Sequence, residues 1–197
     1  MTGKKYEGPS AATRLARIAQ GRYTFGVSDT GEPYALPLDG PRIVKMLRGA
    51  GSLRAEIASV FLSENGTPAP QQALADTLIA LEGIALAAPP KVLALRVADS
   101  HGALWLDLGD DTGELVKITP EGWIIVAEAP VLHRRTALTA PLPRPATDGD
   151  LSALRVLLNI AAADWSVLLA FLVCALISVR RLVSSLWSVP RPSSVPA

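Results

Sequence analysis

Apolar residues recur along this chain with two different spacings. In the segments 11–20, 53–65 and 67–90 they fall three or four positions apart, which is the spacing of one face of a helix. From residue 91 to residue 128 they alternate with polar residues, as in a strand with one face turned toward a core. The pattern therefore predicts an α+β fold, with helices before an antiparallel β-meander.

The helical part begins with a predicted helix at 11–20, capped by Ser10 and ended by Gly21. Leu15 and Ile18 fall on its inner face, and Arg14 and Arg17 fall outside it. A pair of helices follows at 53–65 and 67–90, the first capped by Ser52 and stopped by Asn65-Gly66.

Residues 23–38, YTFGVSDTGEPYALPL, predict a hairpin that turns at Asp-Thr-Gly. Pro33 and Pro37 lack the backbone N–H that a central strand needs, so they favour an edge position for the second strand. Residues 42–51 then predict a short strand or a turn of helix.

Four β-rich runs, VLALRVA, ALWLDLG, LVKIT and WIIVAE, predict the meander. They are separated by Asp-Ser-His-Gly, Gly-Asp-Asp-Thr-Gly and Pro-Glu-Gly, which are turn sequences. Leu104, Leu106 and Leu108 share one face of the second run, so Asp107 and Trp105 share the other.

Asp107, Asp110, Asp111 and Glu114 are close enough in sequence to suggest a metal site. A calcium loop needs oxygen ligands at alternate positions and glycine at the sixth. Counting from Asp107, the third position is Gly109 and the sixth is Thr112, so the template fails. His101 has no partner at zinc-ligand spacing. We therefore expect these acids to form a hairpin turn, with no metal and no cofactor.

The helix pair raises the question of a DNA-binding helix-turn-helix. A helix that reads DNA carries basic or amide side chains at its N-terminus. Gln71 and Gln72 are present, but 70–90 contains no Lys or Arg and contains Asp76 and Glu82. The sequence favours packing over DNA reading, so a nucleic-acid partner has little support.

His133, Arg134 and Arg135 are the candidate contact residues of the chain. Three such side chains in a row suit a phosphate or an acidic partner. The alternative is a solvated strand that reaches the acidic middle segment of its own chain. The surrounding range, 131–150, is rich in proline and predicts a linker, after which Asp148 or Asp150 caps a helix at 151–162.

A second apolar helix follows Asp164. Trp165 to Val179 gives fifteen uncharged residues, about 22 Å of helix against roughly 30 Å of hydrocarbon. The run is short for a membrane span, but Arg180 and Arg181 resemble the positive flank of an anchor. A single-pass protein of the inner membrane, anchored by 163–187, therefore stays open as an alternative. Residues 180–197 predict a disordered tail.

The distribution of charge and the cysteine content restrict the partners and the compartment that we expect for this protein. Residues 1–54 carry nine basic and four acidic residues, 55–130 carry three and eleven, and 131–197 carry seven and three. This asymmetry suggests contacts between segments or with a partner more than general affinity for nucleic acid. The lone Cys174 lies in an apolar run, which predicts a buried thiol, and the N-terminus lacks a secretory core. We expect a cytoplasmic protein.

No nucleophile elbow, zinc-helix, dinucleotide or phosphate-loop motif occurs in the chain, so no catalytic residue is assigned and we expect no enzyme. The ordered series LRVA, GALWLDLGDDTGELVKITPEGWIIV, APVLHRRTALTAPLPRP, GDLSALRVLLNI and DWSVLLAFLVCAL nevertheless resembles a known segment. It is similar to the region before the phosphate loop in actinobacterial, phage- and mobile-element-type ATP-binding proteins. These proteins are related to primase-associated helicases and viral nucleoside triphosphatases.

That resemblance implies an accessory domain of a phage-type helicase or ATPase. It divides the chain into an α+β accessory domain at 1–130, a linker at 131–150, a helical segment at 151–179 that precedes the motor, and the tail at 180–197. In the family a strand and a phosphate loop follow the last helix, whereas ISVRRLVSSLWSVPRPSSVPA resembles nothing there. His133 also departs from the aromatic residue that the family more often has. The resemblance thus implies a truncation near Ile177, no ATP binding, and an ATPase motor or replication proteins as partners.

Overall fold

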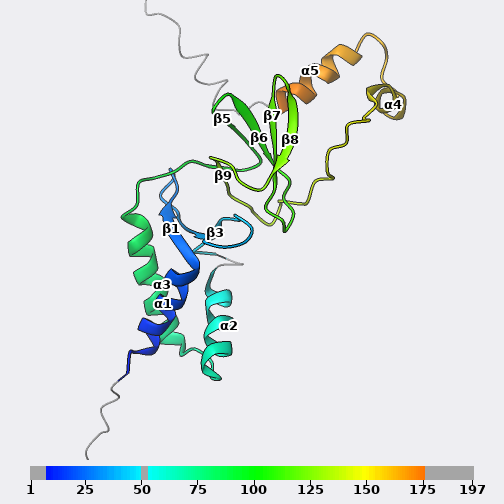
Figure 1. Cartoon of the computed structure of the whole chain (residues 1–197). Helices are drawn as coiled ribbons and strands as arrows, with labels where there is room; N and C mark the ends of the chain where they lie inside the picture. The colour runs from blue at the N-terminus through cyan, green and yellow to red at the C-terminus, as the bar shows by residue number, and fades with distance from the viewer. Residues whose placement is uncertain (1–7, 50–52, 176–197) are drawn as a thin grey trace, which may run out of the picture.

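The chain forms a helical unit, a β-meander and two projecting helices, in that order along the sequence (Figure 1). The computed structural model describes residues 8–49 and 53–175. Helices and antiparallel sheets both contribute, so the predicted α+β class with a meander and C-terminal helices is confirmed.

Three helices build the helical unit: α1 (Ala11–Arg22), α2 (Leu53–Asn65) and α3 (Gln71–Leu86). Ser10 caps α1 as predicted, because its Oγ accepts a hydrogen bond from the Thr13 N–H at 3.1 Å. Ser52, the expected cap of α2, lies outside the described residues. One apolar core joins the three helices to the first strands. Its buried members are Leu15, Ala19, Tyr23, Ala35, Leu47, Leu53, Ile57, Phe61, Leu74 and Leu81.

Arg14 was expected on the outside of α1, but it is half-buried. Its guanidinium lies 5.1 Å from the centre of the Phe61 ring and donates to Asn65 Oδ1 at 2.6 Å. The long side chain follows the surface of α2, so a position that the helical period assigns to solvent contributes to the contact between α1 and α2.

The hairpin consists of β1 (Tyr23–Val27) and β2 (Pro33–Pro37), which pair antiparallel across the predicted turn. The edge position predicted for β2 is wrong, because β3 (Lys45–Met46) pairs with its other side and β2 is central. The two prolines occupy the first and last positions of β2. The register with β3 pairs only Tyr34 and Ala35, and at the end of the strand Pro33 contributes only its carbonyl, which accepts from the Leu47 N–H at 3.1 Å.

The meander pairs β5 (Val97–Ser100), β6 (Ala103–Asp107), β7 (Leu115–Thr119) and β8 (Gly122–Val126) in sequence order. The first predicted run, 92–98, is divided. Its beginning is β4 (Leu93–Ala94), which pairs parallel with β9 (Leu132–His133). β9 lies inside the range 131–150 that the sequence assigns to a linker, so this part of the range is a strand.

The two faces of β6 alternate as predicted, but the more buried face is not the leucine face. Trp105 is 6% exposed and Asp107 is 1% exposed, whereas Leu104 and Leu106 are half-buried. A carboxylate therefore lies on the side of the sheet that packs against the rest of the chain.

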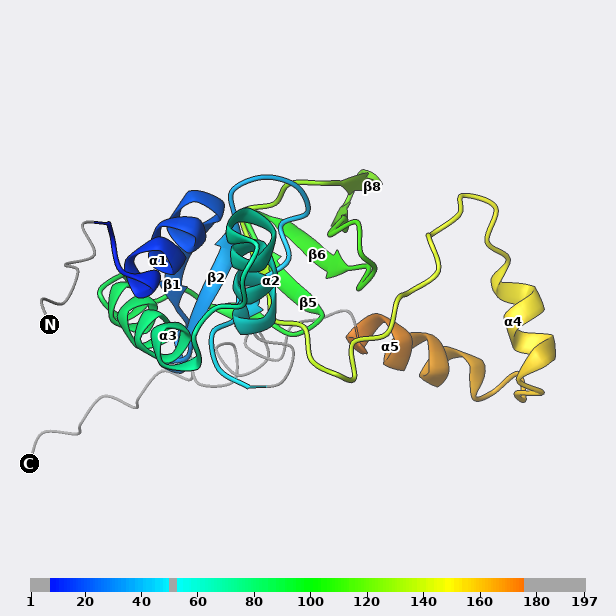
Figure 2. The same cartoon turned by 90° about the horizontal axis from the view of Figure 1, so that it is seen from below.

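The last two helices, α4 (Leu151–Leu157) and α5 (Trp165–Ala175), project from the remainder of the chain (Figure 2). Asp150 caps α4, since its Oδ1 accepts from the Ser152 N–H at 2.8 Å. α4 is shorter than the predicted 151–162, and none of its residues is buried. The end of the predicted helical segment and the tail at 180–197 lie outside the described residues.

Candidate functional site

The strongest polar cluster surrounds Asp107 at the end of β6. Arg135 donates two hydrogen bonds to its carboxylate, from Nε to Oδ2 at 3.0 Å and from Nη2 to Oδ1 at 2.7 Å. The third guanidinium nitrogen donates to the Asp110 carbonyl. The side chains of Asp107 and Arg135 are 2% and 16% exposed, so this bidentate ion pair is largely removed from water.

The electrostatics of Asp107 follow from these partners. Burial by itself raises the pKa of a carboxyl group, but the bonds from Arg135 and from the Gly109 N–H at 3.0 Å outweigh it. The pKa of Asp107 therefore lies below its ordinary value, and the group is a fixed anion at neutral pH. It has neither the proton nor the freedom that a general acid needs.

Gly109 is required for this arrangement. Its φ of +74° lies in the left-handed region. A Cβ built there would stand 2.5 Å from Arg96 Nη1 and 2.8 Å from the Ala140 carbonyl oxygen. No other residue type fits, because both the backbone conformation and the space exclude a side chain.

His133 lies beside the ion pair and is 7% exposed. Its Nε2 is buried and has no hydrogen-bond partner within the described part of the chain. Burial lowers the pKa of His133, and Arg135 and Arg96 lower it further, while Asp107 and the Trp105 backbone act in the opposite direction. The ring is therefore neutral at physiological pH.

A hollow lined by Arg42, Asp107, His133 and Arg135 opens next to this ring. Its free space is about 20 Å³, which is enough for one water molecule and far too little for a nucleotide. The hollow has the size of a structural hydration site.

Further arginine contacts fasten residues 132–144 to the chain. Arg134 pairs with Glu32 of the β1–β2 turn, and Arg144 pairs with Glu114. Arg96 donates to the Asp107 carbonyl at 3.1 Å and to the Ala140 carbonyl at 2.8 Å. These bonds join the β1–β2 hairpin, the meander and the segment after β9.

The three predicted contact residues thus have different environments. Arg135 reaches the acidic middle segment, as the second interpretation expected, and Arg134 reaches an acid nearer the N-terminus. The strand is not solvated, however, because His133 is buried and Arg135 nearly so. A phosphate contact stays a prediction, and both guanidinium groups already hold carboxylates.

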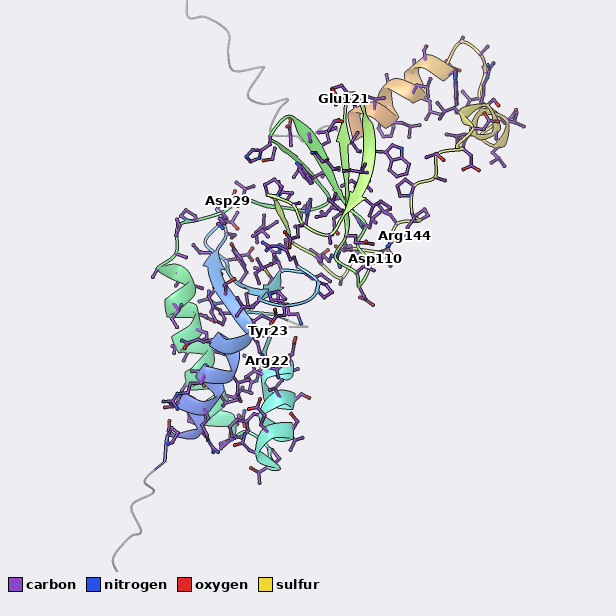
Figure 3. All side chains as sticks on the ribbon, in the orientation of Figure 1. Arg22, Tyr23, Asp29, Asp110, Glu121 and Arg144 are labelled. Atoms are coloured by element: carbon purple, nitrogen blue, oxygen red, sulfur yellow. The ribbon has the colours of Figure 1, made fainter. Side chains whose placement is uncertain are left out.

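The acid-rich stretch separates into a turn and the buried pair. Asp110 accepts from the Thr112 N–H at 3.1 Å and, with Asp111, lies in the reversal between β6 and β7, as predicted. Figure 3 shows Asp110 and Arg144 near one end of the meander and Glu121 at the other. Asp107 belongs to the ion pair instead. Among residues 8–49 and 53–175, no three His, Cys, Asp or Glu side chains are grouped so as to hold a metal ion.

A second polar cluster, which the sequence did not indicate, joins β1, β3 and α2 through Glu56. Its carboxylate accepts from the Tyr23 hydroxyl and from Lys45 Nζ. Burial, followed by the bond to Glu56, raises the pKa of Tyr23 far above its usual value. A phenol held in this state does not exchange protons near neutral pH, so the cluster acts as a structural link. Its residues are 11 to 33 positions apart in sequence, and no local pattern brings them together.

The exposed part of α3 bears on the DNA-binding question. Gln71 and Gln72 are exposed at its start, and Gln72 bonds Asp76 at 2.7 Å. Glu82 pairs with Arg48. Further along, Ile79, Ile84 and Leu86 are exposed, so this face offers phosphates no cation of its own.

The two C-terminal helices, α4 and α5, carry several highly exposed hydrophobic side chains. In α5, Val167, Phe171 and Val173 are between 61% and 69% exposed, and in α4 Val156 and Leu157 are 80% and 82% exposed. The burial predicted for Cys174 is wrong, since its thiol is exposed on α5. Within residues 8–49 and 53–175, no helix is both long and apolar enough to cross a membrane.

No protein-family model, no curated protein and no solved structure matches this chain significantly.

Proposed function

We propose that this chain is a non-catalytic accessory domain of a phage-type helicase or ATPase and that it docks on the motor through α4 and α5. The observation that carries the proposal is the exposed apolar surface of these helices. In α5, WSVLLAFLVCA, the only polar residue other than the terminal Trp165 indole is Ser166. Large contiguous apolar surfaces on a folded chain mark interaction sites.

The interior of the domain supports a binding role over catalysis. The buried carboxylate of Asp107 is neutralised by Arg135, and the hollow beside it has room for one water. Arg134, Arg135 and Arg144 all hold acids of the same chain. These contacts link segments of the domain to one another, which supports a structural use of the three arginines.

A site-specific photo-crosslinking experiment tests the docking proposal. A photoreactive phenylalanine derivative replaces Phe171, which is 69% exposed on α5, and the full chain is irradiated in its source cells. The matched control carries the same group at Leu138, which is 92% exposed and lies outside both helices. We expect position 171 alone to capture a protein that carries a phosphate-loop ATPase domain.

Other products would refute the docking proposal. Crosslinks from position 171 to phospholipid, together with a need for detergent during extraction, would favour the single-pass alternative anchored by 163–187. Equal capture of the ATPase from both positions would show that α5 is not the docking surface. In calorimetry the isolated chain should show no saturable ATP binding, and micromolar binding would contradict a non-catalytic role.

A further inference from the structure

In the part of the chain that the structure describes, the outer edge of β8 has no strand beside it. β8 is the last strand of the meander, and among those residues its one strand partner is β7. Within the described residues, no backbone hydrogen bond joins 122–126 to any element other than β7. Figure 2 shows β8 at the border of the sheet, away from α4 and α5. An edge of this kind presents unpaired N–H and C=O groups that another strand can complete.

The sequence of β8 does nothing to block such pairing. Gly-Trp-Ile-Ile-Val contains no charge and no proline, whereas the opposite edge strand β5 carries Asp99. Charged residues and prolines are the usual protection of an exposed edge. Trp123 is 37% and Ile124 57% exposed, and an open hollow of about 220 Å³ borders both.

We propose that β8 pairs antiparallel with β8 of a second copy of this chain, about a twofold axis at Ile124. In this register Ile124 faces its own counterpart, Trp123 faces Ile125, and Gly122 faces Val126. The two meanders then form one sheet of eight strands, four from each copy. The inference does not depend on the proposed docking of α4 and α5.

A second copy fits this edge because the strand is complementary to itself. The register gives two Trp–Ile pairs and one Ile–Ile pair, and aromatic and β-branched residues are favourable cross-strand partners. Residues directly opposite one another share a face of the sheet. Trp123 shares its face with Ile118 and Leu104, so the apolar face continues from one copy into the other.

The flanking charges determine how strong the pairing is. Glu121 and Glu128 bracket the strand, and in this register Glu121 of each copy faces Ala127 of the other. Glu128 of the other copy is the next residue along, so acids approach one another at both ends. A contact made through five residues is far smaller than the roughly 800 Å² per partner of a stable dimer. The structure therefore assigns a weak dimer that salt strengthens by screening the acids.

Charge substitution at the twofold position gives a test specific for the register. Ile124→Glu places two carboxylates directly opposite each other in the dimer, while within one copy the new acid faces Lys117 on β7. Ile124→Lys places two ammonium groups opposite each other. Sedimentation equilibrium is recorded for each full-length variant alone and for an equimolar mixture, from about 10 μM to about 1 mM.

We expect the wild-type chain to dimerise with an affinity that rises with salt. Each variant alone should associate at least about tenfold more weakly, and the mixture should regain dimers because Glu then faces Lys. Ile79→Glu on α3 is the matched control, since Ile79 is 69% exposed on a different surface, and it should dimerise like the wild type.

Three results would overturn the proposal. The wild type could stay monomeric up to about 1 mM at high salt. The mixture of the two Ile124 variants could fail to regain dimers although each variant remains folded by circular dichroism. Loss of the dimer in Ile79→Glu, with Ile124→Glu unaffected, would place the interface on α3.

Discussion

Removal of the Arg135 side chain should destabilise the fold more than removal of the neighbouring Arg134. In Arg135→Ala the carboxylate of Asp107, which is 2% exposed, loses both of its guanidinium bonds and remains in a buried site. Breaking a buried pair on one side typically costs about 3–5 kcal/mol, because the remaining charge has no compensation. We expect a loss within that range.

Arg134→Ala is the matched control, one residue away in the same segment. Its partner Glu32 is 42% exposed and Arg134 itself 37%, so water screens both charges. Exposed pairs of this kind contribute about 0.2–1 kcal/mol. The two substitutions remove the same side-chain type and differ mainly in the burial of the partner.

Urea denaturation followed by tryptophan fluorescence measures both losses, because Trp105 lies in the buried face of the same strand as Asp107. The double variant Asp107→Leu/Arg135→Met completes the comparison. It removes both charges and should recover much of the lost stability. Two results would refute this reasoning: Arg135→Ala costs no more stability than Arg134→Ala, or the double variant is no more stable than Arg135→Ala. Either result would show that the unpaired charge of Asp107 is not the main cause of the destabilisation.

Three further predictions concern the same region. Folding lowers the pKa of Asp107. The stability that its carboxylate contributes is therefore complete above the unfolded pKa of about 3.9 and is lost as pH falls through the folded pKa. In acid, the urea midpoint of the wild type should fall toward that of Arg135→Ala. Gly109→Ala should lower the free energy of unfolding by about 2–5 kcal/mol in urea denaturation, because it combines backbone strain with overlap between the new Cβ and its neighbours. Gly31→Ala, with φ +82° and open space around it, should cost only about 1–2 kcal/mol. Equal costs for the two substitutions would refute the overlap. Ca²⁺, Mg²⁺ and Zn²⁺ should leave the melting temperature unchanged, and a stoichiometric metal shift abolished by changing Asp110 and Asp111 to Asn would show a metal site.

Local spacing predicted most elements of this fold because helix and strand periods depend on neighbouring residues. The range of α2, 53–65, agrees with its prediction, and β6, β7 and β8 follow their predicted runs, whereas the first run is divided between β4 and β5. Turn chemistry also acts locally, so the reversal at Asp110 and the hairpin between β1 and β2 could be predicted. The apolar character of α5 can likewise be read from its sequence alone.

Tertiary structure decided which of these patterns were buried and what they contacted. Alternation assigns Trp105 and Asp107 to one face of β6, but only tertiary packing makes that face the buried one. Ala94, Val126, Ala129 and Val131 pack against the cluster that contains Trp105, and Arg135 binds Asp107. Asp107 and Arg135 are 28 residues apart, and Tyr23 and Glu56 are 33 apart. Such pairs carry no periodic signal, because the chain between them must first fold before their side chains can meet. The same reason explains β2, whose central position depends on a two-residue strand ten residues later that pairs between its prolines.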